Sequence, residues 1–208
     1  MNIFCSYIKF IYICRMNIQS STMNKRELIL KSALKLITEK GFHGTVMSEM
    51  AKEAGVAAGT IYHYFKTKEE IIAVLYSELK EQFGEAIRNQ LTANKPVKAR
   101  FFGVYSGIYH FFITHPMEFR FLEQYANSPY ISNEIVDENK HFYQGAIDFL
   151  SDGINAGVLR QMDINLMVSL VYGSITTVAK LRVVNQIEVS DEMLQSAIQS
   201  CWDGVRIN

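Results

Sequence analysis

Hydrophobic residues recur at steps of three and four along most of this chain, as in helices that turn one face to a core. The pattern predicts nine helices: residues 24–40, two short helices within 47–65, then 68–91, 96–115, 117–127, 132–155, 163–185 and 191–203. We find no convincing strand pattern and no internal repeat. The expected fold class is therefore all-α.

The stretch from Met47 to Phe65 predicts two short helices joined by a tight turn. Ala51 is small where the second helix must cross closely, and Gly55 supplies the positive φ that a helix end favours. This spacing is typical of a helix-turn-helix, whose second helix lies in a DNA major groove. An ordinary αα-hairpin shares the Ala-x-x-x-Gly spacing, so the spacing alone leaves both interpretations open.

A supporting helix is expected before this stretch. Asn24 or Thr22 can cap it, and Gly41 ends it. Its inward positions, followed by one further core residue, are Leu28, Ala33, Leu34, Leu36, Ile37 and Phe42. Thr45 or Ser48 is expected to cap the next helix, because a hydroxyl can accept a hydrogen bond from a free backbone N–H.

The residues of the second short helix and those after it favour the DNA-binding interpretation. They read Gly59-Thr60-Ile61-Tyr62-His63-Tyr64-Phe65, then Lys66-Thr67-Lys68-Glu69-Glu70. This run is similar to the signature G-T-I-Y-x-Y-F-x-x-K-E-E of the TetR family of transcriptional regulators. The similarity covers residues 24–80, and Gly157-Val158-Leu159-Arg160 resembles the family's loop before its penultimate helix. The resemblance implies a helix-turn-helix domain at residues 23–67 and a helical effector-binding and dimerisation domain at 68–208.

By this resemblance, the DNA-facing positions of the second helix are Ala58, Gly59, Thr60, Tyr62, His63 and Tyr64. Tyrosine and histidine side chains can donate to phosphates, and threonine offers a methyl group and a hydroxyl to base edges. Ala58 can make only apolar contact, so DNA shape is expected to contribute to recognition. Ile61 and Phe65 are assigned to the core.

Three further residues are expected to contact DNA phosphates. Thr45 and Ser48 lie at the N-terminus of the first short helix, where the helix dipole and free N–H groups favour an anion. Lys68 opens the helix that follows the signature, with Lys66 nearby as a helper.

Aromatic residues are unusually dense in the larger domain, and several carry hydroxyl groups. Such rings are more often plain core than a binding site, but a cavity lined by rings with a few polar tips suits a largely apolar small molecule. The resemblance implies an effector site in the same domain. The candidate effector-binding residues are Phe102, Tyr105, Tyr109, Phe121, Tyr125, Tyr143, Tyr172 and Thr176, of which about half are expected to contact the ligand.

The last two helices carry the candidate dimer surface. Residues at steps of three or four mark one side of each: Leu166, Leu170, Gly173, Thr177 and Leu181 on the first, and Met193, Ala197 and Cys201 on the second. These stripes can equally pack inside one chain. Helix-turn-helix proteins generally bind two half-sites as dimers, and the resemblance implies a four-helix interface, so we expect a homodimer on an imperfect palindrome.

Charge and cysteine content agree with this interpretation. Residues 24–68 carry eight Lys or Arg against four Asp or Glu, whereas residues 69–208 carry eleven against seventeen. A basic module on an acidic body fits a DNA-binding protein. The three cysteines include no C-x-x-C pair, which fits a reducing cytoplasm.

The first 22 residues differ from the rest. The apolar run from Ile3 to Cys14 is interrupted by Lys9 and is shorter than the roughly 20 residues that cross a bilayer. We expect either a mis-assigned translation start, with Met23 or Met16 as the true one, or a disordered tail. A genuine hydrophobic arm is the alternative.

These observations predict a cytoplasmic, ligand-responsive repressor that a small, largely apolar effector releases from DNA, with no cofactor, metal or membrane partner. His110, His115 and His141 stand at no recognisable metal-ligand spacing, and no nucleophile elbow is present, so no enzymatic activity is expected. Two alternatives remain. One is an activator or a ligand-insensitive DNA-binding protein of the same fold, and the other is a helical binding protein or enzyme with a vestigial hairpin.

Overall fold

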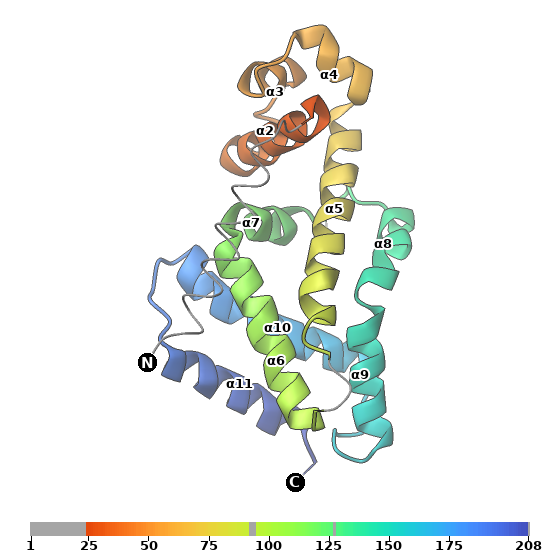
Figure 1. Ribbon diagram of the computed structural model, residues 1–208, viewed down its shortest axis with the longest axis vertical. Coiled ribbons are helices and arrows are strands. Elements are labelled where there is room, and N and C mark those ends of the chain that lie inside the picture. Colours follow the sequence, from red (N-terminus) through yellow and green to blue (C-terminus); the bar gives the residue numbers. More distant parts are fainter. Residues whose placement is uncertain (1–23, 92–94, 127, 208) are drawn as a thin grey trace. The chain divides into compact units, whose positions relative to one another are not determined.

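The computed structural model describes residues 24–91, 95–126 and 128–207. The predictions for residues 1–22, including Thr22 as a cap, lie outside this described part. Within it are ten α-helices and one short 3₁₀ turn, η1, and the chain divides into two compact units between Ile71 and Ile72 (Figure 1).

The first unit contains α2 (Lys25–Lys40), α3 (Met47–Glu53), α4 (Ala58–Tyr64) and the start of α5 (Lys68–Arg88). The cap predicted for α2 is confirmed: the Asn24 side chain accepts from Glu27 N, and Glu27 bonds back to the Asn24 backbone. Gly41 ends the helix with φ of 74°. This reciprocal capping satisfies N–H groups that would otherwise lack partners.

A small core holds the three helices of the first unit together. α2 packs on α3, and α3 on α4. The buried side chains come from all three helices and from the segments beside them: Ile29, Leu30, Ala33, Leu34, Leu36, Ile37, Phe42, Met50, Ala51, Ile61 and Phe65. The hydrophobic spacing of the sequence therefore gives the core of this unit almost directly.

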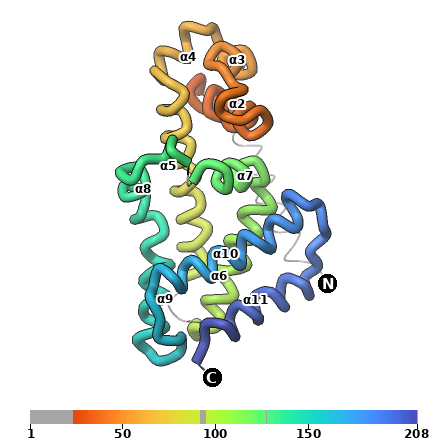
Figure 2. Tube along the Cα trace, turned by 180° about the vertical axis from the view of Figure 1, so that it is seen from behind, coloured from red at the N-terminus to blue at the C-terminus, as the bar shows by residue number. Residues whose placement is uncertain are grey.

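The second unit continues α5 and adds α6 (Val97–Thr114), α7 (Pro116–Tyr125), α8 (Asn133–Asn139), η1 (Lys140–Phe142), α9 (Gln144–Asn155), α10 (Ile164–Val183) and α11 (Asp191–Val205). α6 is its centre, packing on α7, α10 and α11, and the tube view shows α10 crossing it (Figure 2). Seven residues of α6 are buried: Phe101, Val104, Tyr105, Ile108, Tyr109, Phe111 and Phe112. A helix that is apolar on several faces is expected in such a central place.

The predicted helix over residues 132–155 is divided into α8, η1 and α9, which accounts for ten helices where nine were expected. The Asn139 side chain donates to Ile135 O at 2.7 Å and to the Ser77 hydroxyl at 3.0 Å. Side-chain bonds of this kind compete with the regular helical pattern. The division places Tyr143 at the start of α9, against the interior of the unit.

The loop between α9 and α10 joins the C-terminal end of the chain. Gly157 has φ of 68°, and Leu159 forms an antiparallel bridge with Arg206, the nearest approach to a strand among the described residues. Arg160 N donates to Val205 O, and Ile207 N donates to Val158 O. The segment that resembles the family's loop before its penultimate helix thus holds the end of α11.

Candidate DNA-binding and effector sites

The turn between α3 and α4 has the geometry predicted for a helix-turn-helix. Gly55 has φ of 68°, and the turn is closed by Val56 N donating to Ala51 O at 2.9 Å. Ile61 and Phe65 point into the core, as predicted. α4 therefore has one face fixed to the unit and the opposite face in solvent.

The structure brings most of the predicted DNA-facing residues onto that free face. Ala58, Gly59 and His63 are exposed, and Tyr62 and Tyr64 expose 50% and 36% of their surface, although both are large aromatic residues. Thr60 is half-buried. Exposed rings with hydroxyl and imidazole donors can reach DNA phosphates and base edges.

Thr45 and Ser48 do not cap α3 as predicted. The N-cap is Val46, which makes no side-chain cap bond. Thr45 is fully buried, and its hydroxyl donates to Leu36 O and Gly41 O, because the loop from α2 folds over it. Ser48 is exposed in the first turn of α3, so it keeps access to a phosphate and Thr45 does not offer its hydroxyl.

Lys68 holds the loop before α3. Its ammonium donates to Phe42 O at 2.5 Å and to Thr45 O at 2.7 Å, and it lies 4.1 Å from the centre of the Phe42 ring. An ammonium group has three donors, so two are used within the protein. The phosphate contact expected of Lys68 would have to use the third.

Replacing Lys68 by methionine is expected to lower the free energy of unfolding by about 1–2 kcal/mol, because two charge-assisted bonds to backbone carbonyls are lost. Lys66→Met is the matched control, since Lys66 is exposed and, among the described residues, its ammonium bonds only to Tyr62 O. Urea denaturation of both variants measures the difference. An equal loss in both would contradict the structural role of Lys68.

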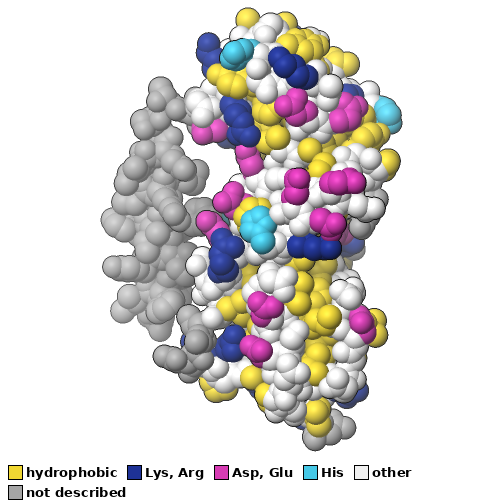
Figure 3. Space-filling view, turned by 90° about the vertical axis from the view of Figure 1, so that its right-hand side faces the viewer, with side chains coloured by type: hydrophobic (Ala, Val, Ile, Leu, Met, Phe, Trp, Pro, Cys, Tyr) yellow, Lys and Arg dark blue, Asp and Glu magenta, His cyan; other side chains and the backbone are white. Residues whose placement is uncertain are grey.

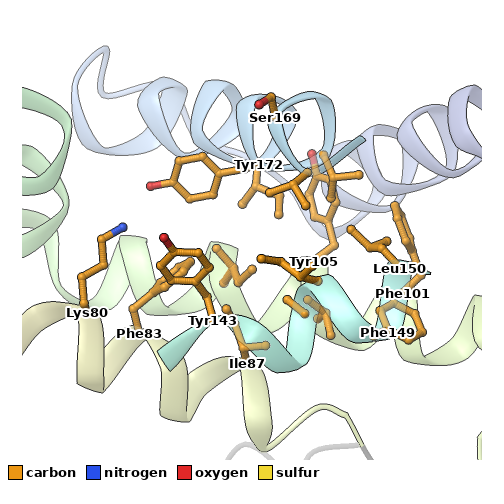
Figure 4. Close-up of a pocket in the computed structure, with 17 residues that line it drawn as sticks. Lys80, Phe83, Ile87, Phe101, Tyr105, Tyr143, Phe149, Leu150, Ser169 and Tyr172 are labelled. Carbon is orange, nitrogen blue, oxygen red and sulfur yellow. The ribbon is translucent and has the colours of Figure 1, made fainter. Parts of the chain in front are cut away.

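The second unit encloses a cavity of about 200 Å³. Its walls come from α5, α6, α9 and α10 and from Tyr143: Lys80, Phe83, Ile87, Phe101, Val104, Tyr105, Ile108, Tyr143, Ala146, Ile147, Phe149, Leu150, Val168, Ser169, Val171, Tyr172 and Ile175. The hydroxyls of Tyr143 and Tyr172 and the Lys80 ammonium gather at one end (Figure 4). Phe101, Phe149 and Leu150 line the other end. An apolar cavity with a few convergent polar groups is the usual form of a small-molecule site.

The polar end of the cavity is electrostatically unusual. Burial lowers the pKa of Lys80 to about 8. Burial also raises the pKa of Tyr76 to about 12 and raises the pKa values of Tyr143 and Tyr172. All these shifts favour neutral forms, because a charge is poorly solvated there.

Three of the eight predicted effector-binding residues line this cavity: Tyr105, Tyr143 and Tyr172. The other five do not line it. The Phe102 ring contacts the Lys98 ammonium, the Tyr109 ring contacts His110, and the rings of Phe121 and Tyr125 contact each other. The Thr176 hydroxyl donates to Gly173 O. Helical spacing finds buried rings but does not say which of them border an empty space.

Lys80 was missed by the sequence analysis. It follows Tyr76 by four residues and precedes Phe83 by three and Ile87 by seven, so it shares the apolar face of α5. A single lysine within such a face is a signal that could have been recognised, because lysine is almost never buried without a partner.

The stability of the protein is expected to rise between pH 7 and pH 9 through Lys80. The pKa of Lys80 in the folded protein is about 8, below the ordinary 10.5. Between these two values Lys80 is protonated in the unfolded chain but largely deprotonated in the folded one, so raising the pH favours the folded state. Lys80→Met should remove this rise and be more stable at pH 7 by about 1–2 kcal/mol. Urea titrations of both proteins at pH 7 and pH 9 test this. A variant whose free energy of unfolding rises between these pH values as much as that of the wild type would contradict it.

The predicted dimer stripe is largely in solvent. Leu166 and Leu170 each expose 51% of their surface and Met193 exposes 45%, and Thr177 is also exposed. Gly173, Leu181, Ala197 and Cys201 are half-buried. Among the described helices, α10 alone has the length and composition to cross a membrane, and less than a third of its apolar window is buried. An exposed apolar face of this size is typical of a protein interface.

Neither the surface charge nor the histidines indicate a further site. On the face shown in Figure 3, basic and acidic side chains are interspersed. The Nδ1 atoms of His110, His115 and His141 lie within hydrogen-bond distance of the carbonyls of Ser106, Phe111 and Glu138. No cluster of metal-ligating side chains occurs in the described ranges.

Comparison with known proteins decides the family. Residues 29–75 match the family model for bacterial regulatory proteins of the tetR family, and residues 76–207 match the tetracycline repressor-like C-terminal domain. The chain belongs to the TetR family. It is therefore a transcriptional regulator that binds operator DNA as a homodimer and responds to a small-molecule effector.

Relatives of this TetR-family regulator include the fatty acid metabolism regulator protein of Bacillus subtilis (strain 168). The two are 31% identical over 166 residues, or 76% of this chain and 82% of the relative. A crystal structure of FadR from Bacillus subtilis in complex with stearoyl-CoA has a TM-score of 0.68 and 25% identity, covering 85% of this chain and 97% of that one. A TetR-family structure from Marinobacter aquaeolei VT8 has a TM-score of 0.82 at 20% identity, covering 88% and 96%.

The relatives also bear on the expectations about enzymatic activity and fold class. They are bacterial transcriptional regulators rather than enzymes. The fold matches along most of the length of each solved structure, which agrees with the all-helical prediction.

Proposed function

We propose that this TetR-family regulator represses genes of fatty-acid metabolism and leaves its operator when a compound with a fatty acyl chain occupies the cavity of the second unit. The observation that carries the proposal is the apolar cavity between α5, α6, α9 and α10, whose far wall consists of phenylalanine and leucine side chains. The comparisons support it, because a relative from Bacillus subtilis is a fatty acid metabolism regulator and the similar FadR structure from the same species holds stearoyl-CoA.

The proposal assigns DNA contact to the first unit, corresponding to a domain at residues 23–67. The exposed face of α4, together with Ser48 and Lys68, would contact one operator half-site. The stripe on α10 and α11 would form the homodimer, so that two copies of α4 reach two half-sites of a palindrome. The exposed leucines of α10 support this placement.

α5 gives the proposed response a physical route. Lys80, Phe83 and Ile87 of α5 line the cavity, while Lys68 at its start holds the loop before α3. A ligand that displaces the cavity end of α5 would favour a dimer shape with different operator affinity. It acts only through unequal affinity for the two shapes, and about 1–3 kcal/mol of coupling is typical, or roughly 5–150-fold in affinity.

Fluorescence anisotropy tests this function. The protein is titrated onto a duplex from upstream of its own gene and onto a scrambled duplex, at two salt concentrations. Preferential, salt-sensitive binding with two chains per duplex is expected, because phosphate contacts release counterions. Oleate and stearoyl-CoA are then added, and a fall in operator affinity is expected. Operator affinity unchanged at saturating concentrations of both would overturn the fatty acyl assignment.

A further inference from the structure

Lys80 is the one charged residue among the seventeen that line the cavity. Its ammonium lies over three rings, 5.3 Å from the centre of Tyr76, 5.7 Å from Phe83 and 5.4 Å from Tyr143. Within the described part of the chain, no hydrogen bond or ion pair joins it to another residue. The Lys80 side chain is half-buried, and the ring contacts offset part of the cost of removing its ammonium from water but supply no anion.

Two acidic residues near this end are already paired. In addition to burial, the negative charge of Asp137 helps to raise the pKa of Tyr143, and that of Glu123 helps to raise the pKa of Tyr172. Asp137 forms an ion pair with Lys140, and Glu123 forms one with Lys180. Burial alone accounts for the lowered pKa of Lys80. The free protein therefore keeps a cation in an apolar cavity without a matching negative charge, which is costly unless a ligand supplies one.

We propose that the Lys80 end of the cavity is a carboxylate-binding site, where the head group of a free fatty acid pairs with the ammonium while its chain lies toward Phe101, Phe149 and Leu150. The inference rests on the proposed function, since it names the form of the fatty acyl effector. Figure 4 shows the Tyr143 and Tyr172 hydroxyls directed to the same end as the ammonium, where each can donate to a carboxylate oxygen.

The charge of the site favours a free acid over a coenzyme A thioester. A thioester carbonyl is neutral, and the several phosphate groups of coenzyme A would require several cations. The lining offers one cation, which matches the single charge of a carboxylate.

The test compares dodecanoate, methyl dodecanoate and dodecanoyl-CoA by calorimetric titration of the full-length protein. The acid and the ester share one chain and differ in charge. The wild type is expected to bind the acid about ten- to one-hundred-fold more tightly than the ester, the range of a charge-assisted hydrogen bond. Lys80→Met should abolish this preference, and its continued binding of the ester would show that the variant is folded.

Lys98→Met is the matched control, because the Lys98 ammonium also lies over a ring, 5.2 Å from the centre of Phe102, but outside the cavity. It should keep the preference for the acid. Equal affinity of the wild type for acid and ester, tighter binding of dodecanoyl-CoA than of the acid, or a preserved preference in Lys80→Met would each overturn this inference alone. Failure of all three ligands to bind would overturn the proposed function as well.

Discussion

Replacing Leu170 by glutamate is expected to convert the homodimer to a monomer and to weaken operator binding by about one hundred- to ten-thousand-fold. Leu170 exposes 51% of its surface in the single chain, so the variant chain can fold. In the proposed interface the new carboxylate would be buried without a partner, which is strongly unfavourable. The loss of affinity follows because two linked half-site contacts become one.

Analytical ultracentrifugation measures whether each variant is a monomer or a dimer, and fluorescence anisotropy with operator DNA measures its affinity for the operator. Met117→Glu is the control, since Met117 is an exposed apolar residue of α7 that does not belong to the stripe and has 37% of its surface in solvent. It should remain dimeric. A Leu170→Glu protein that still sediments as a dimer would show that the interface lies on another surface.

Replacing Gly84 by alanine is expected to destabilise the protein by about 3 kcal/mol, the upper end of the range for overpacking. A Cβ atom at Gly84 would lie 2.4 Å from the backbone oxygen of Phe142, so α5 and η1 would have to separate. Because Tyr143 follows Phe142 and lines the cavity, the same shift should also weaken ligand binding.

Gly204→Ala is the matched control, because Gly204 is also helical but has open space around its Cβ position. That substitution should raise stability by about 0.5–1 kcal/mol, since glycine is unfavourable within helices. Urea denaturation of the two variants gives the comparison. A Gly84→Ala protein as stable as the wild type would mean that α5 and η1 do not approach this closely in solution.

Local signals in the sequence were sufficient for the DNA-binding module. The spacing of Ala51, Gly55 and Ile61 predicts two helices and a tight turn, and the run from Gly59 to Glu70 identifies them as a helix-turn-helix; the structure has the positive φ at Gly55 and the buried Ile61. The exposed positions of α4 follow from the same periodicity, because three or four residues separate neighbours on one helix face. The role of Lys68 did not follow, since its bonds reach residues 26 and 23 positions away.

The cavity shows the opposite case. Periodicity marks Tyr105, Tyr109 and Phe121 alike as buried rings, and all three are buried. Only Tyr105 borders the cavity, because the empty space is set by how α5, α6, α9 and α10 meet. The break at η1, which brings Tyr143 to the wall, depends on a bond from Asn139 to Ser77, 62 residues away.

The sequence by itself determined the helix-turn-helix, the family and every helix except the divided segment at 132–155, because these depend on residues close together in the chain. Tertiary structure alone decided that Thr45 is buried, that Lys68 bonds within the protein and that Lys80 stands unpaired in an apolar cavity. The Thr45 hydroxyl bonds to the end of α2, Lys68 bonds to a loop more than 20 residues away, and Lys80 faces helices that lie far from α5 in the sequence. The physical reason is that the solvation and pairing of a polar group are set by everything packed around it.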